Sequence, residues 1–526
     1  MAKNRFIALL IPLFIFLIAL VYRGYGFLNT PFWVDEFSTA FQANLMRKYT
    51  VNLLTQQDYY VEYHNFTPHF LVASSFEWLG ESTTNARLPF ILIGSLVPVC
   101  VWLFGKRALR DDATALAAAA LTTFSYFEIT WSRQARGYVL QQTLLLFVLI
   151  CYFWLFSAKS RRSIALAVGG LLLGIVGGVL THLTFLFVVV ALSLHAAWYF
   201  RQEVKQKVLR NRVFIGLLAV CLLLLGYLSV GPISRFISFL LSGHVPNNLP
   251  YYHSFLWREY GVIIILSLIG YGYGLLKQPK VFTLLGGISL IYLFFFGFIF
   301  EPRVSRYLLP IFPLLFISAG LGLRFLSESF VQLLALKNAQ KRNWLMGILP
   351  FLLALLIVAN GDKFVLKPKT FYSVNHDFRE IALIDYDQVY QFIKEKGELG
   401  EGQTAVIDTW GDRLAWYLGP EFEAGYVFRW TNESELLKQT AFEVTASGEK
   451  IVAKRNGMRL ISSVDDLQRA MTQYPKGFIW IDDSSLPADV REFAEKNFKV
   501  ELYQDHYTLD DNPYSIWPGT LYSWGL

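Results

Sequence analysis

The most distinctive chemical feature of the chain is an acidic pair, Asp35 and Glu36, that follows its first long apolar run. The run ends near Tyr22, so both carboxylates are expected at the depth of the lipid headgroups. Charge near hydrocarbon is costly unless it contacts water, a metal ion or a cation. A carboxylate in a partly dry cleft can accept a proton from a hydroxyl nucleophile. We therefore predict catalytic roles for Asp35 and Glu36, with a solvated loop pair as the alternative.

Four arginines are expected near the same membrane surface: Arg133 and Arg136 follow one apolar run, and Arg303 and Arg306 precede another. The planar guanidinium group binds phosphate oxygens through paired hydrogen bonds. A phosphate ester held in this way is a good leaving group, because its developing charge is already countered. We predict that these arginines bind a donor phosphate. The alternatives are snorkelling side chains and, for the second pair, ion pairing with Glu301.

A divalent metal ion (Mg, Mn or Zn) is a further possibility. His64 and His69 flank a short segment that follows Glu62, and imidazole and carboxylate groups suit such metals. Hydrogen-bonded loop histidines are the alternative. Tyr138 and His182 are predicted to line the same site, although His182 also fits a plain helix end.

The composition excludes an ordinary soluble enzyme: of 526 residues, 54% are hydrophobic and 17% charged, and the mean hydropathy is +0.39. Apolar runs of roughly 17–20 residues match the ~30 Å of hydrocarbon that a helix must cross. We predict a polytopic α-helical membrane protein with about eleven spans. They are expected near 6–22, 87–104, 113–131, 138–157, 164–181, 183–200, 213–230, 260–276, 281–300, 306–325 and 344–360.

Basic residues predict the topology. Lys3 and Arg5 place the N-terminus in the cytoplasm, and later basic clusters follow alternate runs. An odd number of spans then places the C-terminal part outside the cytoplasm of an inner (plasma) membrane. A large first outer loop, 23–86, is expected to hold an interfacial helix near 69–79. The net charge of +7 reflects this topology, so no nucleic-acid partner is expected.

After residue 360 the apolar runs shorten and charged residues become frequent. Strand-like segments at 404–408 and 477–482 alternate with helical ones at 388–396 and 490–498. We therefore predict a membrane domain over 1–360 and a periplasmic soluble α/β domain over 361–526.

Ionisable residues gather at the outer span ends, and the predicted midplanes hold almost none. A transporter usually needs polar groups near the midplane. The pattern therefore favours a reaction at the outer headgroup plane. A lipid or sugar transporter or flippase is the alternative, and an inactive scaffold that binds a lipid-linked sugar is a third.

Several short motifs resemble those of the GT-C superfamily of integral-membrane glycosyltransferases. The nearest group contains the protein O-mannosyltransferases and the lipid A aminoarabinose transferase, that is, glycosyltransferase family 39 and its bacterial relatives. The resemblance covers roughly residues 5–330. It rests on Trp33-Val34-Asp35-Glu36, His64–Phe70, Gly80-Glu81-Ser82 with Ala86-Arg87-Leu88-Pro89, Ser132–Tyr138, Thr181-His182 and Arg306-Tyr307-Leu308-Leu309-Pro310.

The resemblance implies an inverting, metal-dependent or metal-assisted transfer of a monosaccharide from a polyprenyl-phosphate donor on the periplasmic face. In that scheme Asp35 is the base toward the acceptor hydroxyl, Glu36 assists, and the arginines hold the donor phosphate. The acceptor would be a protein, a lipid or a glycan. Some relatives have an acid where Tyr138 stands, and Thr67 replaces a basic residue often found there.

Overall fold

The chain divides into two units, which are described separately. The computed structural model describes residues 2–26, 31–48, 65–207, 216, 246–300, 302–335, 338–369, 384–399, 403–419, 422–429, 443–445, 448–452, 458–482, 486–504 and 518–526. The first unit, called the membrane unit, contains Met1–Phe27, Glu62–Leu71 and Thr84–Asn375. The second, called the sheet unit, contains Leu28–Val61, Val72–Thr83 and His376–Leu526, so two parts of the predicted outer loop group with the C-terminal region.

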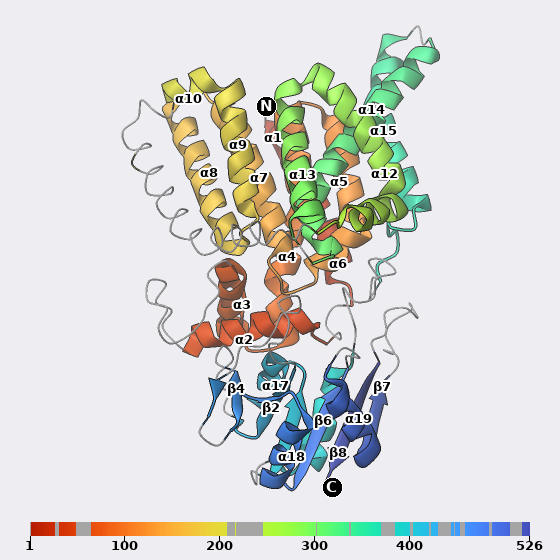
Figure 1. Cartoon of the computed structure of the whole chain (residues 1–526). Coiled ribbons are helices and arrows are strands. Elements are labelled where there is room, and N and C mark those ends of the chain that lie inside the picture. The colour runs from red at the N-terminus through yellow and green to blue at the C-terminus, as the bar shows by residue number, and fades with distance from the viewer. Residues whose placement is uncertain are drawn as a thin grey trace. The chain divides into compact units, whose positions relative to one another are not determined.

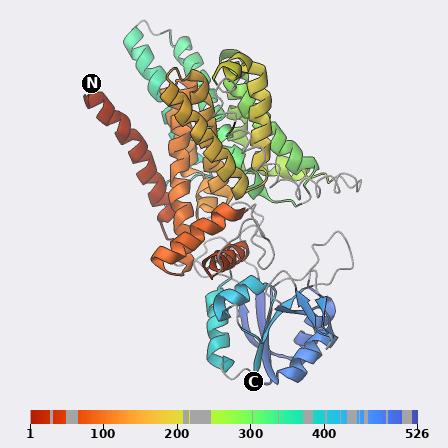
Figure 2. The same cartoon turned by 90° about the vertical axis from the view of Figure 1, so that its left-hand side faces the viewer.

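The membrane unit is a bundle of apolar helices (Figure 1). Figure 2 shows α1 at the outside of the bundle. The helices are α1 (Ala2–Gly24), α4 (Thr83–Phe104), η3 (Gly105–Leu109), α5 (Asp112–Phe124), α6 (Tyr126–Ser132), α7 (Tyr138–Ser157), α8 (Arg161–Thr181), α9 (Phe185–Tyr199), α10 (Arg201–Lys207), α12 (Leu249–Lys277), α13 (Pro279–Phe298), η4 (Ser305–Ile311), α14 (Phe312–Leu333) and α15 (Ala339–Asn360).

Within the described residues, seven helical segments are long and apolar enough to cross a membrane, and three shorter apolar helices accompany them. These ten coincide with ten of the eleven predicted spans. The remaining one, 213–230, lies outside the described residues. The chain is therefore a multi-pass membrane protein, as its composition predicted.

Helices α12 and α14 of the membrane unit approach each other through glycines. A Cβ atom added to Gly270 would lie 1.8 Å from the carbonyl oxygen of Ser318, and one added to Gly322 would lie 2.2 Å from that of Leu266. Small residues allow membrane helices to make such contacts, where packing rather than the hydrophobic effect drives association.

A break at Ser125 separates α5 from α6 and sets the position of α6. The freed backbone groups pair with the segment after α15: the Tyr126 amide donates to the Lys363 carbonyl (3.0 Å), and the Val365 amide donates to that of Phe124 (2.9 Å). An unpaired amide in hydrocarbon costs several kcal/mol. The segment after α15 thus stabilises the break between α5 and α6, and so fixes the position of the residues on α6.

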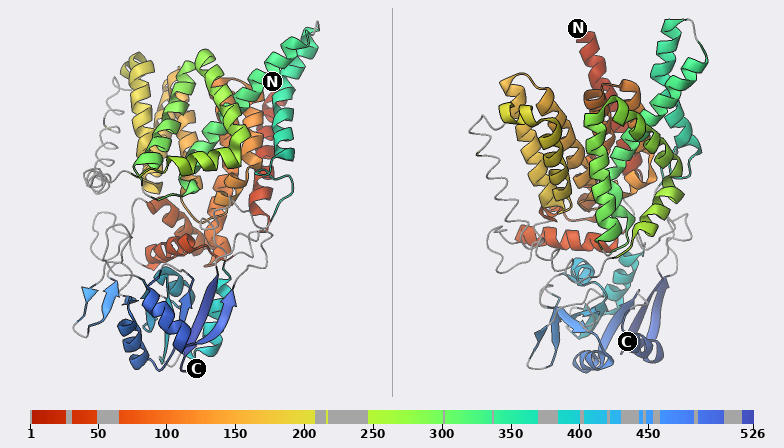
Figure 3. Two further views of the ribbon diagram at one scale, coloured as in Figure 1. Left: turned by 45° about the vertical axis from the view of Figure 1, so that its right-hand side comes forward. Right: turned by 45° about the horizontal axis from the view of Figure 1, so that its top comes forward.

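The sheet unit contains a mixed sheet in the order β3-β4-β5-β2-β1-β6-β8-β7. The four central strands, β5, β2, β1 and β6, are parallel, and antiparallel strands complete both edges. Figure 3 shows the sheet from two further sides. The strands are β1 (Thr404–Asp408), β2 (Gly425–Phe428), β3 (Glu443–Val444), β4 (Lys450–Val452), β5 (Met458–Ile461), β6 (Lys476–Ile481), β7 (Lys499–Gln504) and β8 (Gly519–Trp524).

Helices complete this unit: α2 (Val34–Lys48), α16 (Tyr386–Lys396), α17 (Gly411–Leu418), α18 (Val464–Gln473), α19 (Ala488–Asn497) and the later part of α3 (Phe66–Leu79). One core joins Ile407 and Ile479 of the sheet to Leu467 of α18 and Val490 of α19. The predicted strands and helices of the C-terminal region are confirmed, as is a helix at 69–79, and so is the predicted α/β character of the region.

A buried cluster lies where the parallel strands β1 and β6 end. The Arg413 guanidinium of α17 is fully buried and donates to Asp408, with one bond of 2.8 Å, and to Asp482 at 3.1 Å. Its plane lies 4.1 Å from the ring centre of Tyr386. Burial raises the pKa of Tyr386 and Tyr390, so these hydroxyls stay protonated and donate to Asp482 and Asp408 respectively.

We expect Arg413→Met to destabilise the sheet unit by about 3–5 kcal/mol, because it leaves two buried carboxylates without their cation. Amide hydrogen exchange of β1 and β6 in the full-length protein measures this loss as reduced protection. Unchanged protection of both strands would contradict the assigned role of the cluster.

A second prediction concerns Asp466 of α18. Burial alone would raise its pKa, but hydrogen bonds from Lys450 (2.9 Å) and the Ser462 amide (3.0 Å) outweigh burial and lower it. A lowered pKa stabilises the fold above the unfolded value of about 3.9, and this stabilisation is lost as the pH falls through the folded value. We expect the Asp466→Asn protein to lose less stability than wild type as the pH falls from about 5 to about 2, through the lowered pKa of the folded state. Denaturant titrations across that range give the comparison.

Candidate functional site

Five side chains of the membrane unit form a cluster, called the Arg306 group: Trp131, Tyr138, His182, Arg306 and Tyr307. The Arg306 guanidinium carbon lies 5.8, 6.0 and 5.7 Å from the ring centres of Trp131, Tyr138 and Tyr307. Its Nε donates to the Tyr138 hydroxyl (3.2 Å). The His182 ring centre lies 6.1 Å from that of Tyr138 and 6.3 Å from that of Tyr307. The fold thus brings together three predicted site residues, Tyr138, His182 and Arg306.

Arg306, His182 and Tyr307 are partly exposed, whereas Trp131 and Tyr138 are buried. The group therefore combines an accessible cation with a wall of aromatic rings. Ring faces attract a guanidinium group and hold its plane in a fixed direction. Such an arrangement can present the guanidinium fork to an anionic ligand.

Four elements carry the group: α6, the start of α7, the corner between α8 and α9, and η4. A Cβ atom at Gly137 would lie 2.8 Å from Pro68 Cγ and 3.1 Å from Thr181 Cγ2, so a glycine is needed where the loop before α7 approaches the end of α8. Two glutamines of α7 connect this helix to the start of α9 and to η4. Gln141 donates to Thr184 (2.7 Å), and Gln142 donates to the Leu309 carbonyl of η4 (2.7 Å).

Beneath the group lies a buried polar layer. Arg23 of α1 is fully buried and donates through Nε to Ser132 (3.1 Å). Gln142 donates to Glu128 Oε1 (2.9 Å). Glu128 Oε2 has no hydrogen-bond partner among the described residues, although the carboxylate is electrostatically coupled to Arg23. This layer fixes α6 against α1 and α7, and thereby the floor of the site.

Arg133, predicted to bind phosphate, is buried and hydrogen-bonded to backbone carbonyls. Its Nε donates to Arg23 (3.0 Å), and its Nη2 donates to Tyr22 (2.8 Å), Tyr25 (2.6 Å) and Lys369 (3.1 Å). Helix C-termini expose carbonyls that a cation can satisfy. The guanidinium of Arg133 therefore ties the end of α1 to the segment after α15.

The other two predicted arginines have different surroundings. Arg136 lies in the loop between α6 and α7 and is partly exposed. It precedes Tyr138 of the Arg306 group by two residues. Arg303 is exposed and donates to the Asn248 side chain (3.0 Å) at the start of α12. Its alternative partner, Glu301, lies outside the described residues.

The acidic pair belongs to the sheet unit, in the first turn of α2. Glu36 is fully buried, and its Oε2 accepts a hydrogen bond from the Trp33 amide (2.9 Å). This is the backward bond of a capping box, which satisfies an amide at the helix start. Asp35 beside it is partly exposed. Of the two side chains, that of Asp35 is the more exposed.

The predicted metal ligands cannot be assembled from the described part of the chain. Glu62 and His64 lie outside the described residues, and His69 is buried in α3. Among the described residues, no three His, Cys, Asp or Glu side chains come close enough to hold a metal ion. The residues that are described therefore do not fit a metal site, and no step below depends on one.

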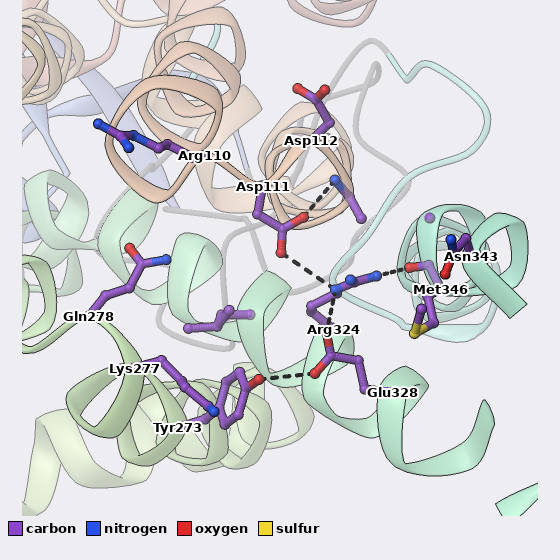
Figure 4. Close-up of a pocket in the computed structure, with 13 residues that line it drawn as sticks. Arg110, Asp111, Asp112, Tyr273, Lys277, Gln278, Arg324, Glu328, Asn343 and Met346 are labelled. Atoms are coloured by element: carbon purple, nitrogen blue, oxygen red, sulfur yellow. Dashed lines mark hydrogen bonds and ion pairs between the residues drawn. The ribbon is translucent and has the colours of Figure 1, made fainter. Parts of the chain in front are cut away.

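A cavity of about 600 Å³ lies at the opposite end of the membrane unit, where α5 begins. Figure 4 shows Arg324 at its centre, paired with Glu328 (3.0 Å) and Asp111 (3.6 Å). The Tyr273 hydroxyl donates to Glu328 (2.9 Å), which adds α12 to the network. These bonds join α5, α12 and α14. We interpret this network as a structural junction of the helix ends, separate from the Arg306 group.

Sequence reasoning missed Trp131, Gln141, Gln142, Thr184 and Tyr307. Trp131 and Tyr307 stand within two residues of a predicted arginine, which is the signal that their positions offered. The glutamines offered none beyond being polar residues inside an apolar run, which in a membrane helix is itself a functional signal.

The comparisons with known proteins agree with this architecture. Residues 64–228 match the family described as dolichyl-phosphate-mannose-protein mannosyltransferase. The crystal structure of ArnT from Cupriavidus metallidurans in the apo state is similar at 12% identity, with 99% of this chain and 98% of that chain covered and a TM-score of 0.56. No curated protein sequence matches.

A second solved structure is similar over much of the chain. It is the oligosaccharyltransferase of Archaeoglobus fulgidus tethered with an acceptor peptide containing the NVT sequon, at 11% identity, with 90% of this chain and 69% of that chain covered and a TM-score of 0.53. The chain thus shares the fold of these two solved structures, in agreement with the resemblance seen in its motifs.

Proposed function

We propose that the chain transfers a monosaccharide from a polyprenyl-phosphate donor to a hydroxyl acceptor. The observation that carries this proposal is the Arg306 group, an accessible guanidinium fixed among aromatic rings in a GT-C fold. The description of the matching family names a dolichyl-phosphate-linked sugar, which supports a polyprenyl-phosphate donor for this chain.

In the proposed reaction the acceptor oxygen attacks the anomeric carbon of the sugar, and the bond from that carbon to the phosphate oxygen breaks. A single displacement of this kind inverts the anomeric centre. The acceptor proton passes to Asp35, and the electron pair of the broken bond leaves on the polyprenyl phosphate. Arg306 counters the charge that develops on this phosphate, with Arg136 as a second candidate.

The remaining predicted residues act around this step. Glu36 assists by holding the first turn of α2 through its bond to the Trp33 amide. Tyr138 directs the Arg306 guanidinium, and His182 lines the site. Arg133 positions α1, and Arg303 contributes to phosphate binding only if the donor reaches the start of α12. We further propose that the N-terminus is cytoplasmic and that the reaction takes place on the periplasmic side of the inner membrane.

The test is transfer from a panel of radiolabelled polyprenyl-phosphate sugars by the purified protein, in the presence of an extract that supplies protein, lipid and glycan acceptors. Release of polyprenyl phosphate and label transfer from one donor are expected. If no donor is consumed, a transport assay in sealed vesicles distinguishes a flippase from an inactive scaffold.

A further inference from the structure

The C-terminal sheet has a topological switch point between β1 and β6. From β1 the chain continues to β2 and then β5 on one side, and it returns to β6 on the other side of β1. Open α/β sheets bind ligands in the crevice beyond the carboxyl ends of the strands at such a point. Here Asp408 ends β1 and Asp482 follows β6, so both lie at that crevice.

The crevice is filled by the chain itself. Arg413 of α17 lies between the two carboxylates and is fully buried, and Thr409 beside it donates to Asp482 (3.0 Å). This buried charge cluster fixes α17, which also carries Trp416 and Tyr417.

These aromatic residues contact α2, the helix that carries the acidic pair. The Phe32 ring lies 5.0 Å from that of Trp416, and the Phe37 ring lies 5.8 Å from that of Tyr417. Phe37 also contacts Tyr386, at 5.7 Å between ring centres. Phe32 and Phe37 are both buried.

The two anchored rings flank Asp35 in the sequence, at positions 32 and 37. Toward its other end, α2 contacts α3 and the turn that follows it: Asn44 donates to Glu81 (2.6 Å), and Arg47 pairs with Glu77 and Glu81 at 3.4 Å, through partly exposed side chains. Exposed ion pairs contribute little to stability. The ring contacts of Phe32 and Phe37 with α17 attach the end of α2 that carries Asp35.

We propose that the C-terminal sheet holds α2 in place of a ligand and so positions Asp35 for the transfer reaction. Phe37, Trp416 and Tyr417 are then positioning residues, which act through α2 and do not contact the substrate. The inference rests on the proposed function for its activity readout, whereas the attachment of α2 can be measured without it.

The experiment compares Phe37→Ala and Trp416→Ala in the full-length protein, with Asp466→Asn as the control. Asp466 is a buried residue of the same unit, and its carboxylate accepts hydrogen bonds from Lys450, Arg469 and Ser462. Amide exchange of residues 34–48 is expected to accelerate at least about tenfold in both alanine variants, with β1 still protected. Transfer is expected to fall about 100-fold in kcat with the KM for the donor unchanged, because small displacements of a reacting group have effects of that size. A Phe37→Leu protein should recover part of the rate.

Protected α2 amides in both alanine variants would overturn the attachment. Accelerated exchange with a wild-type kcat would overturn the positioning role. If Trp416→Ala also opens β1, Phe37→Ala decides, because that change lies on α2 and leaves the sheet intact. Failure of the wild-type protein to use any donor would count against the proposed function alone, since the exchange results do not depend on turnover.

Discussion

The Asp35→Asn protein is expected to bind donor normally and to transfer sugar about 10²–10⁴-fold more slowly than wild type, the usual contribution of a general base. Asp35 is the partly exposed member of the acidic pair, and an amide cannot accept the acceptor proton. Single-turnover transfer from radiolabelled donor, beside a donor-binding measurement, gives both quantities.

Glu36→Gln is the matched control. A glutamine at this position can still accept the hydrogen bond from the Trp33 amide, so the capping bond of α2 is kept while the charge is removed. We expect a rate within about threefold of wild type, because the hydrogen bond that holds the first turn of α2 is kept. Two results would contradict the assignment of Asp35 as the base. One is a near-normal transfer rate in Asp35→Asn, and the other is a loss of rate in Glu36→Gln as large as that in Asp35→Asn.

The second large effect is expected at Arg306. We expect Arg306→Lys to weaken donor binding by about 10–100-fold, because an ammonium group cannot form the paired hydrogen bonds that a guanidinium fork makes to phosphate. The Tyr138 bond and the three ring contacts would also be altered. Binding of polyprenyl phosphate to the purified variant, measured at several salt concentrations, tests this expectation.

Arg133→Lys provides the comparison, because Arg133 was also predicted to bind phosphate but donates to backbone carbonyls at the end of α1. We expect this variant to lower thermal stability and to leave the affinity for polyprenyl phosphate within about threefold of wild type. The reverse pattern, with donor affinity lost at Arg133 and retained at Arg306, would exchange the roles assigned to the two arginines.

Much of the fold could be predicted from local properties. Apolar runs of membrane-spanning length are a property of composition and length, so ten predicted spans coincide with described apolar helices. The strand at 404–408 was predictable for a similar reason, because a short β-branched run with buried neighbours has few other stable conformations. The division of the chain into two units could not be predicted from local properties, because two segments of the predicted outer loop group with the C-terminal sheet.

The site shows the same distinction at the level of single residues. The sequence by itself determined which residue types could bind a phosphate or accept a proton, and it placed Tyr138, His182 and Arg306 near helix ends. Only the tertiary structure decided their neighbours, because contacts such as that of Arg306 with Tyr138 join segments more than 100 residues apart. Arg133 and Arg306 are the same residue type at equivalent predicted depths. The first donates to carbonyls at the end of α1 and after α15, and the second lies among rings of α6, α7 and η4, a difference that depends on how distant helices pack.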